Sequence, residues 1–295
     1  MKKVIFEGAG VAIVTPFTAD GKVNYQVLEK LINRQIENET DAIVICATTG
    51  ENSTLSDEEH EKTIKFAVDC VAGRVPVVAS SGSNDTEYAL NLSKEAEAAG
   101  ADALLMVTPY YNKTSQDGLV RHFHYIADRV SLPIIVYNVP SRTGLNILPE
   151  TYYKLSRHPR IVATKEANGD IAALAHTISL CGDDLDVYSG NDDQIAAFVA
   201  LGAKGVISVI SNVIPKVAHD MAIKGVKGDI AASTKLQLEY FQLCHDLFID
   251  VNPIPVKEAL NMMGLDVGEC RMPLAPMSDE KKEILSKTLK KYNLI

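Results

Sequence analysis

The chain has few cysteines and no long run of apolar residues. Its five cysteines form no Cys-x-x-Cys pair and their number is odd, which predicts reduced, packed thiols rather than a disulfide framework. No segment approaches the roughly 18 consecutive apolar residues of a membrane-spanning helix. Glu7 and Thr15-Pro16 interrupt the N-terminal apolar stretch, and no small-residue cleavage site follows clearly. We therefore expect a cytoplasmic protein without a secretory leader.

Positive charge is also scarce. Lysine and arginine number 29 against 38 aspartate and glutamate residues, which gives a formal net charge of −9 and a pI near 5.3. This balance argues against nucleic acid or an anionic membrane surface as a partner. It also slightly opposes an anionic substrate, so an acid would need a local positive anchor. With 46% hydrophobic and 23% charged residues, the 295-residue chain is otherwise an ordinary globular protein.

Short strands rich in Val, Ile and Ala alternate with amphipathic helices along most of the chain. Strands are predicted at residues 11–15, 42–47, 75–80, 103–108, 134–138, 161–165, 186–189 and 205–209, spaced by about one βα unit. Helices are predicted over 24–38, from a capping box at Ser56 to residue 72, and over 86–99 before Gly100. Because the strands lack a clean apolar/polar alternation, we predict an α/β fold, a (β/α)₈ TIM barrel over residues 1–229. The helical segment 230–295 is too short for a large core of its own and is expected to pack on the barrel.

Lys165 stands at the end of one predicted strand, where the active site of such a barrel lies. A solvated lysine has a pKa near 10.4, but a dry pocket can lower it toward ~7–8. The free amine can then attack a carbonyl and form a Schiff base. A lone lysine at a strand end is more often snorkelling or salt-bridged, so the prediction depends on its neighbours.

Other strand ends bring hydroxyls, tyrosines and one arginine toward the same edge of the barrel. Imine formation needs proton transfers, which a phenol such as Tyr137 can provide through a chain of hydroxyls. Backbone N–H groups in the Thr48-Thr49-Gly50 turn suit the carboxylate of an α-keto acid. Arg142 supplies a fork for a second carboxylate. Taken singly, Tyr137 could equally be a core tyrosine and Arg142 a surface charge.

Five motifs extend the pattern over the whole chain. They are TTGE at 48–51, TPYYN at 108–112, YNVPSRTG at 137–144, TKEANGD at 164–170 and SGNDD at 189–193. With these motifs in this order, the sequence resembles the dihydrodipicolinate synthase (4-hydroxy-tetrahydrodipicolinate synthase) family, C-terminal helices included. The YxxP and Lys-Glu-Ala elements belong to the wider superfamily of Schiff-base lyases, which also contains N-acetylneuraminate lyase. The RTG triplet and TPYYN point to the synthases.

The resemblance implies a lyase of the class I aldolase type that condenses pyruvate with aspartate 4-semialdehyde. This is the committed step toward diaminopimelate and lysine. Lys165 would form the imine with pyruvate. Tyr137 would be the general acid and base, linked through Thr48 to Tyr111, which in the family reaches across a dimer interface into the neighbouring site.

The resemblance also implies the substrate-binding residues. Thr48 and Thr49 would hold the pyruvate carboxylate, and Arg142 would anchor the carboxylate of the aldehyde. Gly190 and Ile207 would shape the pocket. Because the imine nitrogen accepts the electrons, no metal or organic cofactor is implied. Family members are usually homotetramers built as pairs of tight dimers.

A second site implied by the resemblance binds lysine as an inhibitor at the tight-dimer interface. The corresponding positions here are Asn52, Ser53, Asp57, His60, Asn84, Tyr88 and Tyr110. Asp57 stands where sensitive members usually have His, and Tyr88 where they have Glu. The change at 88 removes a partner for a ligand ammonium, although Asp57 adds one nearby, so we expect weak or absent inhibition. Ala47 is a further departure, because the family usually has Gly before TTGE and an alanine is expected to crowd the turn.

Two other functions remain open. Sister aldolases use the same lysine and tyrosine on a sugar acid or another 2-keto-3-deoxy acid, although Arg142 suits a short substrate with a terminal carboxylate. A non-catalytic barrel that binds a keto acid would have no need to keep Lys165, Tyr137, Thr48 and Tyr111 together. Trapping of a pyruvate adduct with borohydride would separate that barrel from both enzymes.

Two motifs are set aside. His122 and His124 fall on a predicted helix, where residues two apart point to different sides, so a shared metal is not expected. The glycines at 8 and 10 lack a third glycine and follow no convincing strand, so a dinucleotide site is not supported.

Overall fold

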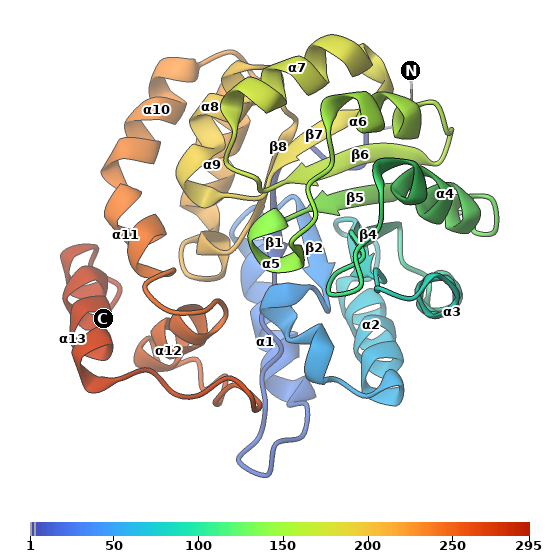
Figure 1. Cartoon of the computed structure of the whole chain (residues 1–295). Helices are drawn as coiled ribbons and strands as arrows, with labels where there is room; N and C mark the ends of the chain where they lie inside the picture. Colours follow the sequence, from blue (N-terminus) through green and yellow to red (C-terminus); the bar gives the residue numbers. More distant parts are fainter. Residues whose placement is uncertain (1, 3) are drawn as a thin grey trace.

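The strands pair in sequence order and close into a barrel. In the computed structural model, which describes residue 2 and residues 4–295, eight parallel strands form the ring and β8 returns to pair with β1 (Figure 1). The strands are β1 (Gly8–Ala12), β2 (Ala42–Ile45), β3 (Val77–Ser80), β4 (Ala103–Val107), β5 (Ile134–Asn138), β6 (Ile161–Glu166), β7 (Asp186–Ser189) and β8 (Gly205–Ser208). Nearly all their residues are buried, because helices cover the outer face and side chains fill the interior. The predicted (β/α)₈ TIM barrel is confirmed.

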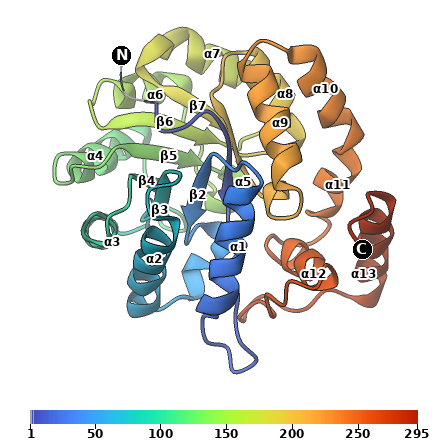
Figure 2. The same cartoon turned by 180° about the vertical axis from the view of Figure 1, so that it is seen from behind.

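Helices cover the outside of the ring and continue beyond it. Those between and after the strands are α1 (Tyr25–Glu37), α2 (Asp57–Val71), α3 (Thr86–Ala99), α4 (Gln116–Ala127), α5 (Pro140–Thr143), α6 (Pro149–Ser156), α7 (Ile171–Cys181), α8 (Ile195–Ala200) and α9 (Pro215–Val226). The C-terminal segment adds α10 (Ile230–Glu239), α11 (Phe241–Asp246), α12 (Ile254–Met262) and α13 (Asp279–Lys291). Helix α10 packs on α8 and α9, and α13 packs on α11 and α12, so the segment lies against one side of the barrel (Figure 2). Within the described residues, no helix combines the length and apolarity needed to span a bilayer.

The helix boundaries follow the signals in the sequence. Ser56 and Glu59 form the predicted capping box, in which each side chain accepts the backbone N–H of the other residue. The Asn24 side chain accepts the N–H of Val27 at the start of α1. Gly100 ends α3 in the left-handed conformation, as predicted.

The prediction of a first strand at 11–15 is wrong by three residues, since β1 occupies Gly8–Ala12. Its glycines permit close approaches that a side chain would prevent. A Cβ on Gly10 would lie 2.8 Å from the Phe6 ring, and one on Gly205 of β8 would lie 1.8 Å from the Gly8 carbonyl oxygen. Glycine is depleted in strands, so its presence concealed the start of this one. The β1–β8 seam that closes the barrel depends on this contact.

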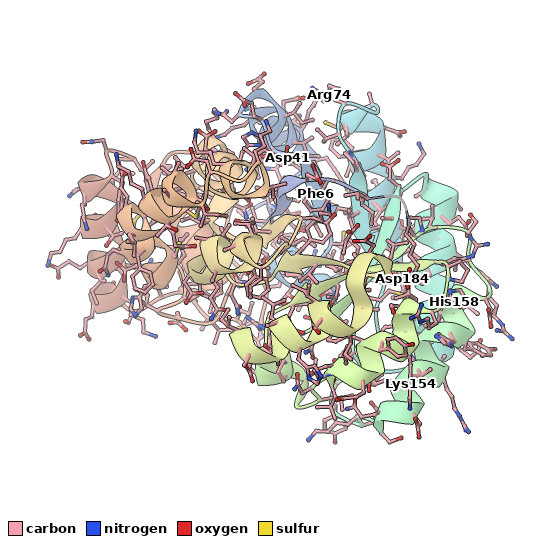
Figure 3. The ribbon with its side chains drawn as sticks, turned by 90° about the horizontal axis from the view of Figure 1, so that it is seen from above. Phe6, Asp41, Arg74, Lys154, His158 and Asp184 are labelled. Carbon is pink, nitrogen blue, oxygen red and sulfur yellow. The ribbon has the colours of Figure 1, made fainter. Side chains whose placement is uncertain are left out.

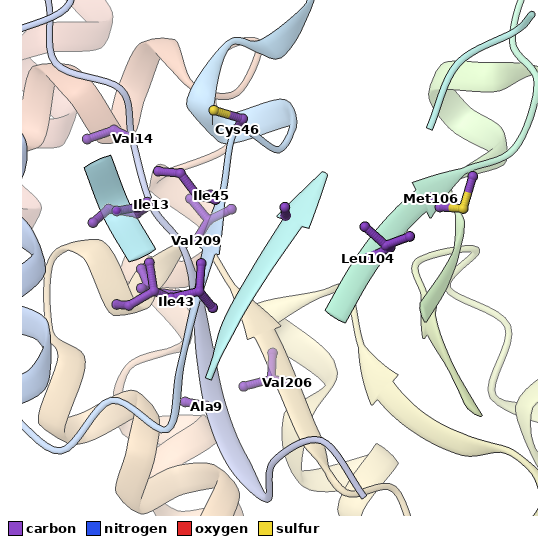
Figure 4. Close-up of a cluster of buried hydrophobic side chains, with 14 of the residues drawn as sticks. Ala9, Ile13, Val14, Ile43, Ile45, Cys46, Leu104, Met106, Val206 and Val209 are labelled. Carbon is purple, nitrogen blue, oxygen red and sulfur yellow. The ribbon is translucent and has the colours of Figure 1, made fainter. Parts of the chain in front are cut away.

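Alternate strand residues divide the core into two layers. Val44, Leu105 and Ile207 belong to the layer that fills the barrel interior. Ile43 and Ile45, one residue away on β2, belong to the layer between strands and helices, shown in Figure 4. All five cysteines lie in the described part of the chain and are free thiols, as predicted.

An aromatic pair fills the end of the barrel at which β1 begins. Phe6 stacks on Tyr188 with the ring centroids 4.3 Å apart, and the Tyr188 hydroxyl donates to the Phe6 carbonyl at 2.7 Å. Nearby, Asp41 accepts the Ala9 N–H at 2.7 Å, and Figure 3 labels Phe6 and Asp41. These side chains fill the end of the barrel at which the strands begin. The opposite end, formed by the carboxyl ends of the strands, is left for the site.

Candidate active site

Lys165 and Tyr137 lie side by side on neighbouring strands. Tyr137 on β5 is directly in register with Lys165 on β6, so the two side chains leave the sheet on the same face. The Lys165 Nζ atom lies 4.3 Å from the centroid of the Tyr137 ring, and the two residues are 4% and 7% exposed. A lysine and a phenol are therefore held together in a dry environment.

Burial shifts the pKa of both groups. Loss of solvation lowers the pKa of Lys165 to about 8, with the Asp192 carboxylate opposing this shift and the Arg142 guanidinium adding to it. Burial raises the pKa of Tyr137 to about 12, although Arg142 and a hydrogen bond with Thr48 act in the other direction. Near neutral pH the phenol is protonated and the amine has gained a substantial neutral fraction. This combination suits a nucleophile beside a proton donor.

A cavity of about 480 Å³ opens beside this pair. Its lining includes three of the predicted active-site residues, Thr48, Tyr137 and Arg142. It also includes most of the predicted effector residues, Asn52, Ser53, Asp57, His60, Tyr88 and Tyr110. Lys165 does not line this cavity, but it lies against Tyr137, which does. Three predicted active-site residues and six predicted effector residues therefore line one continuous space, whereas Lys165 and Thr49 lie outside its lining.

The TTGE motif forms a tight turn after β2. Thr48–Gly50 is one turn of 3₁₀ helix, and the buried Thr49 hydroxyl accepts a hydrogen bond from the Asn252 amide at 3.1 Å. Ala47, which precedes the turn, has an extended backbone with φ −83° and ψ −169°. An alanine adopts this conformation without strain, so the expected crowding is not caused by the backbone.

Arg142 and Tyr111 reach different surroundings. Arg142 lies on the short helix α5, and its Nη2 donates to the Asn252 carbonyl at 3.1 Å. Among the described residues it has no ion-pair partner, so most of its fork is available to a ligand. Tyr111 is 91% exposed, with a left-handed backbone (φ 66°), and does not line this chain's own cavity. One chain therefore brings Lys165, Tyr137, Thr48 and Arg142 together but leaves Tyr111 outside.

Gly190 lies close to the lysine, whereas Ile207 belongs to the cluster that fills the barrel interior. A Cβ on Gly190 would lie 3.2 Å from Cε of Lys165 and 2.7 Å from Cβ of Ala167, so a side chain there would press on the lysine. Ile207 is fully buried in the barrel interior, in the same cluster as Tyr137. Of the two residues, Gly190 is the one that leaves room for the lysine side chain.

The two altered effector positions contact each other. The Tyr88 hydroxyl donates to the Asp57 carboxylate, and this contact contributes to raising the pKa of Tyr88 to about 12. His60 is buried, and its Nε2 lies 2.9 Å from the Ser80 carbonyl, so Nε2 carries the proton. Asn84 lies apart from the cavity lining, where its carbonyl accepts from the Asn112 amide. The one carboxylate added at this site is thus already engaged by the tyrosine.

Sequence reasoning gave no role to two buried acids near the site. Asp192 is fully buried, and its Oδ2 accepts the N–H groups of Val209 and Ile210 at 2.9 and 2.8 Å. Glu166 follows Lys165 but faces the other way, where it accepts from the Tyr152 hydroxyl at 2.6 Å. The SGNDD and TKEANGD motifs contained both acids, and the alternation of side chains along β6 would have separated Glu166 from the lysine.

The two histidines of the set-aside motif have separate partners in the structure. Nδ1 of His122 lies 2.9 Å from the Thr86 hydroxyl, whereas the His124 ring lies tilted beside His158 with centroids 5.2 Å apart, so the two histidines have different partners. Over residues 2 and 4–295, no group of three His, Cys, Asp or Glu side chains is arranged to hold a metal ion.

Comparison with known proteins identifies the family. The model of the dihydrodipicolinate synthetase family matches residues 5–292. The chain belongs to this family. A family member from Acetivibrio thermocellus, a 4-hydroxy-tetrahydrodipicolinate synthase, is 54% identical over 295 residues and covers 100% of both chains. The resemblance predicted from the five motifs is therefore confirmed.

Solved structures of dihydrodipicolinate synthases share the fold. The chloride-inhibited enzyme from Acinetobacter baumannii, complexed with pyruvate, superimposes with a TM-score of 0.97 at 42% identity, over 99% of this chain and 100% of that one. The enzyme from Cyanidioschyzon merolae, with lysine bound, gives 0.96 at 36% identity, again over 99% and 100% of the two chains. These relatives bind a keto acid and an amino acid on the same architecture.

Proposed function

We propose that this chain is a 4-hydroxy-tetrahydrodipicolinate synthase, a lyase that condenses pyruvate with L-aspartate 4-semialdehyde in lysine and diaminopimelate biosynthesis. The observation that carries the proposal is the buried Lys165 amine, 4.3 Å from the Tyr137 ring, with its pKa lowered to about 8. Family membership and the relatives' shared activity support the same conclusion.

The first half of the reaction uses the lysine as a nucleophile. The neutral Lys165 amine attacks C2 of pyruvate and forms a carbinolamine, which loses water to give the iminium. Thr48 and Thr49 hold the pyruvate carboxylate in the turn after β2. Tyr137 passes protons to and from the oxygen that leaves, assisted by its hydrogen bond with Thr48. The positive nitrogen then accepts the electron pair when a proton leaves C3, which yields the enamine.

The second half joins the two substrates. C3 of the enamine attacks the aldehyde carbon, and the new alkoxide takes a proton and becomes the 4-hydroxyl group. Arg142 pairs with the carboxylate of the aldehyde substrate. The substrate amine next attacks the imine carbon, closes the six-membered ring and releases Lys165. The sum consumes one molecule of each substrate and releases one water, so no external oxidant or reductant is needed.

A neighbouring copy supplies Tyr111 in this proposal. Its 91% exposure in one chain fits a residue that completes the proton relay of a partner. We propose a homotetramer of two tight dimers in the cytoplasm, with the barrel (residues 1–229) carrying the site and residues 230–295 packed on it. Mixing inactive Lys165→Ala and Tyr111→Phe chains should restore about a quarter of wild-type activity, because half of the mixed dimers would be heterodimers with one intact site. No recovery after subunit exchange would argue against a shared site.

The test of the reaction is a coupled assay with pyruvate and aspartate semialdehyde, in which added dihydrodipicolinate reductase oxidises NADPH. We expect activity in the wild type and in Lys154→Ala, which removes an exposed lysine, and none in Lys165→Ala. A silent wild type that still forms a borohydride-trapped pyruvate adduct would favour a sister aldolase on 2-keto-3-deoxy acids. A silent wild type without an adduct would leave only a keto-acid-binding barrel.

We also propose that lysine inhibits this enzyme weakly or not at all. The site lacks a carboxylate at position 88, and the Tyr88 hydroxyl engages Asp57. A ligand ammonium must displace that hydrogen bond before it can pair with the carboxylate. Tyr88→Glu is therefore expected to strengthen inhibition by lysine, and Tyr125→Glu, which replaces another tyrosine hydrogen-bonded to an acid, is the matched control. Substantial inhibition of the wild type below millimolar lysine would contradict the proposal.

A further inference from the structure

Asn252, in the segment between α11 and α12, contacts both predicted carboxylate anchors. Its side-chain amide donates to the Thr49 hydroxyl at 3.1 Å, and its main-chain carbonyl accepts from Arg142 at 3.1 Å. It is 6% exposed and does not line the cavity. One residue of the C-terminal segment thus links the turn after β2 to helix α5.

A buried ion pair holds the other end of the same turn. Glu51 has a left-handed backbone (φ 56°), and its carboxylate accepts from Lys257 Nζ and from the Arg271 N–H, each at 2.8 Å. The Glu51 and Lys257 side chains are only 1% and 2% exposed. Lys257 and Arg271 both belong to the C-terminal segment. The TTGE turn is therefore fixed from Thr49 to Glu51 by residues about 200 positions later in the chain.

The hydrogen-bond directions leave both anchors ready for a ligand. Because the Thr49 oxygen accepts from Asn252, its own O–H remains free to donate to an anion. Arg142 uses one N–H on the Asn252 carbonyl and has no acidic partner within residues 2 and 4–295. The side-chain amide and the main-chain carbonyl of Asn252 are both neutral. They can therefore orient Thr49 and Arg142 without replacing the substrate carboxylates as partners of these donors.

We propose that Asn252 is a positioning residue for the pyruvate carboxylate, acting through Thr49, and that its carbonyl sets the place of Arg142 relative to that turn. The C-terminal segment thereby fixes the spacing between the two substrate carboxylates. This inference rests on the proposed function and deepens it. It assigns a role in substrate binding to a residue that does not touch the cavity.

For the wild type and each variant, we would measure how the rate at which borohydride traps the pyruvate adduct depends on pyruvate concentration, with no aldehyde present. Asn252→Ala should raise the half-saturating pyruvate concentration about tenfold. Such a loss is typical when one hydrogen bond that orients the donor to a charged ligand is removed. The Michaelis constant for the aldehyde in the coupled assay should change much less, because the main-chain carbonyl remains. Asn261→Ala is the matched control, since that amide donates to the Gly268 carbonyl within the same segment and does not contact the turn.

Asn252→Leu keeps nearly the volume of the side chain, removes its donor and adds no charge, so it controls for a loss of packing. If Asn252 merely fills space, the leucine variant should bind pyruvate normally. If it positions Thr49, the leucine variant should bind pyruvate as poorly as the alanine variant, because neither side chain can donate to the Thr49 hydroxyl. Thr49→Val combined with Asn252→Ala should be no worse than Thr49→Val alone.

The trapping experiment distinguishes a failure of the Asn252 inference from a failure of the proposed function. Folded Asn252 variants with unchanged pyruvate half-saturation, or additive effects of the two substitutions, would overturn the inference while leaving the proposed function intact. A wild type that traps no pyruvate would overturn the proposed function and, with it, this inference.

Discussion

The reactivity of Lys165 should depend on pH in a way that its burial dictates. Lowering the pKa of Lys165 from 10.5 to about 8 means that burial destabilises the charged amine relative to the neutral amine by about 3 kcal/mol. At pH 7 the neutral fraction rises from a few molecules in ten thousand to nearly one in ten, roughly a 300-fold gain in nucleophile. Because only the neutral amine attacks, the rate of imine formation should rise with pH and level off above about 8.

The assay is the rate of borohydride trapping at a fixed, sub-saturating pyruvate concentration across pH 6 to 10. Asp192 should set where the midpoint falls, because its carboxylate raises the pKa of Lys165. Asp192→Asn keeps the shape and should move the midpoint to lower pH. The neighbouring Asp193 is exposed, so Asp193→Asn makes the same charge change and should leave the midpoint in place. A wild-type midpoint near 10 would refute the reasoning, as would equal shifts in the two variants.

Two further predictions concern residues beside the lysine and the TTGE turn. Tyr137→Phe should lower kcat by about 10²–10⁴-fold while Lys165 still forms a trapped adduct slowly, and near-normal kcat would exclude the phenol as the proton donor. Lys257→Met should lower the free energy of unfolding by about 3–5 kcal/mol, because it leaves the Glu51 carboxylate buried and unpaired. Thermal unfolding should show a fall in Tm of roughly 10 °C. Lys257→Met with Glu51→Gln should recover most of that loss, and a double variant no more stable than the single one would contradict a buried ion pair.

The sequence predicted the barrel well because its signals are local. Strand starts were placed within three residues, and the caps at Ser56 and Gly100 were identified from short patterns. The first strand was misplaced because Gly8 leaves room for the Asp41 side chain and Gly10 for the Phe6 ring, and a strand pattern does not reveal such packing. Tertiary packing, rather than propensity, decided that element.

The site was predictable where residues fall at strand ends. Lys165 and Tyr137 were expected together because consecutive parallel strands place their ends at one edge, and the register confirms their proximity. Asn252 and Lys257 could not be found this way. They come from a C-terminal segment whose docking on the barrel depends on the whole fold. Neither an asparagine in the turn before α12 nor a lysine within α12 carries a positional signal.

The β1–β8 seam has a consequence for the chain during its synthesis. Gly8 pairs with Gly205, so the ring stays open, with two unpaired strand edges, until about 70% of the chain has left the ribosome. The hydrogen bonds of Asn252 with Thr49 and Arg142 must form later still. A nascent or truncated chain that already contains Lys165 therefore exposes unpaired strand edges that can aggregate, before its site is assembled. The barrel edges are therefore paired once β8 has been made, and the assembled site follows only with the C-terminal segment.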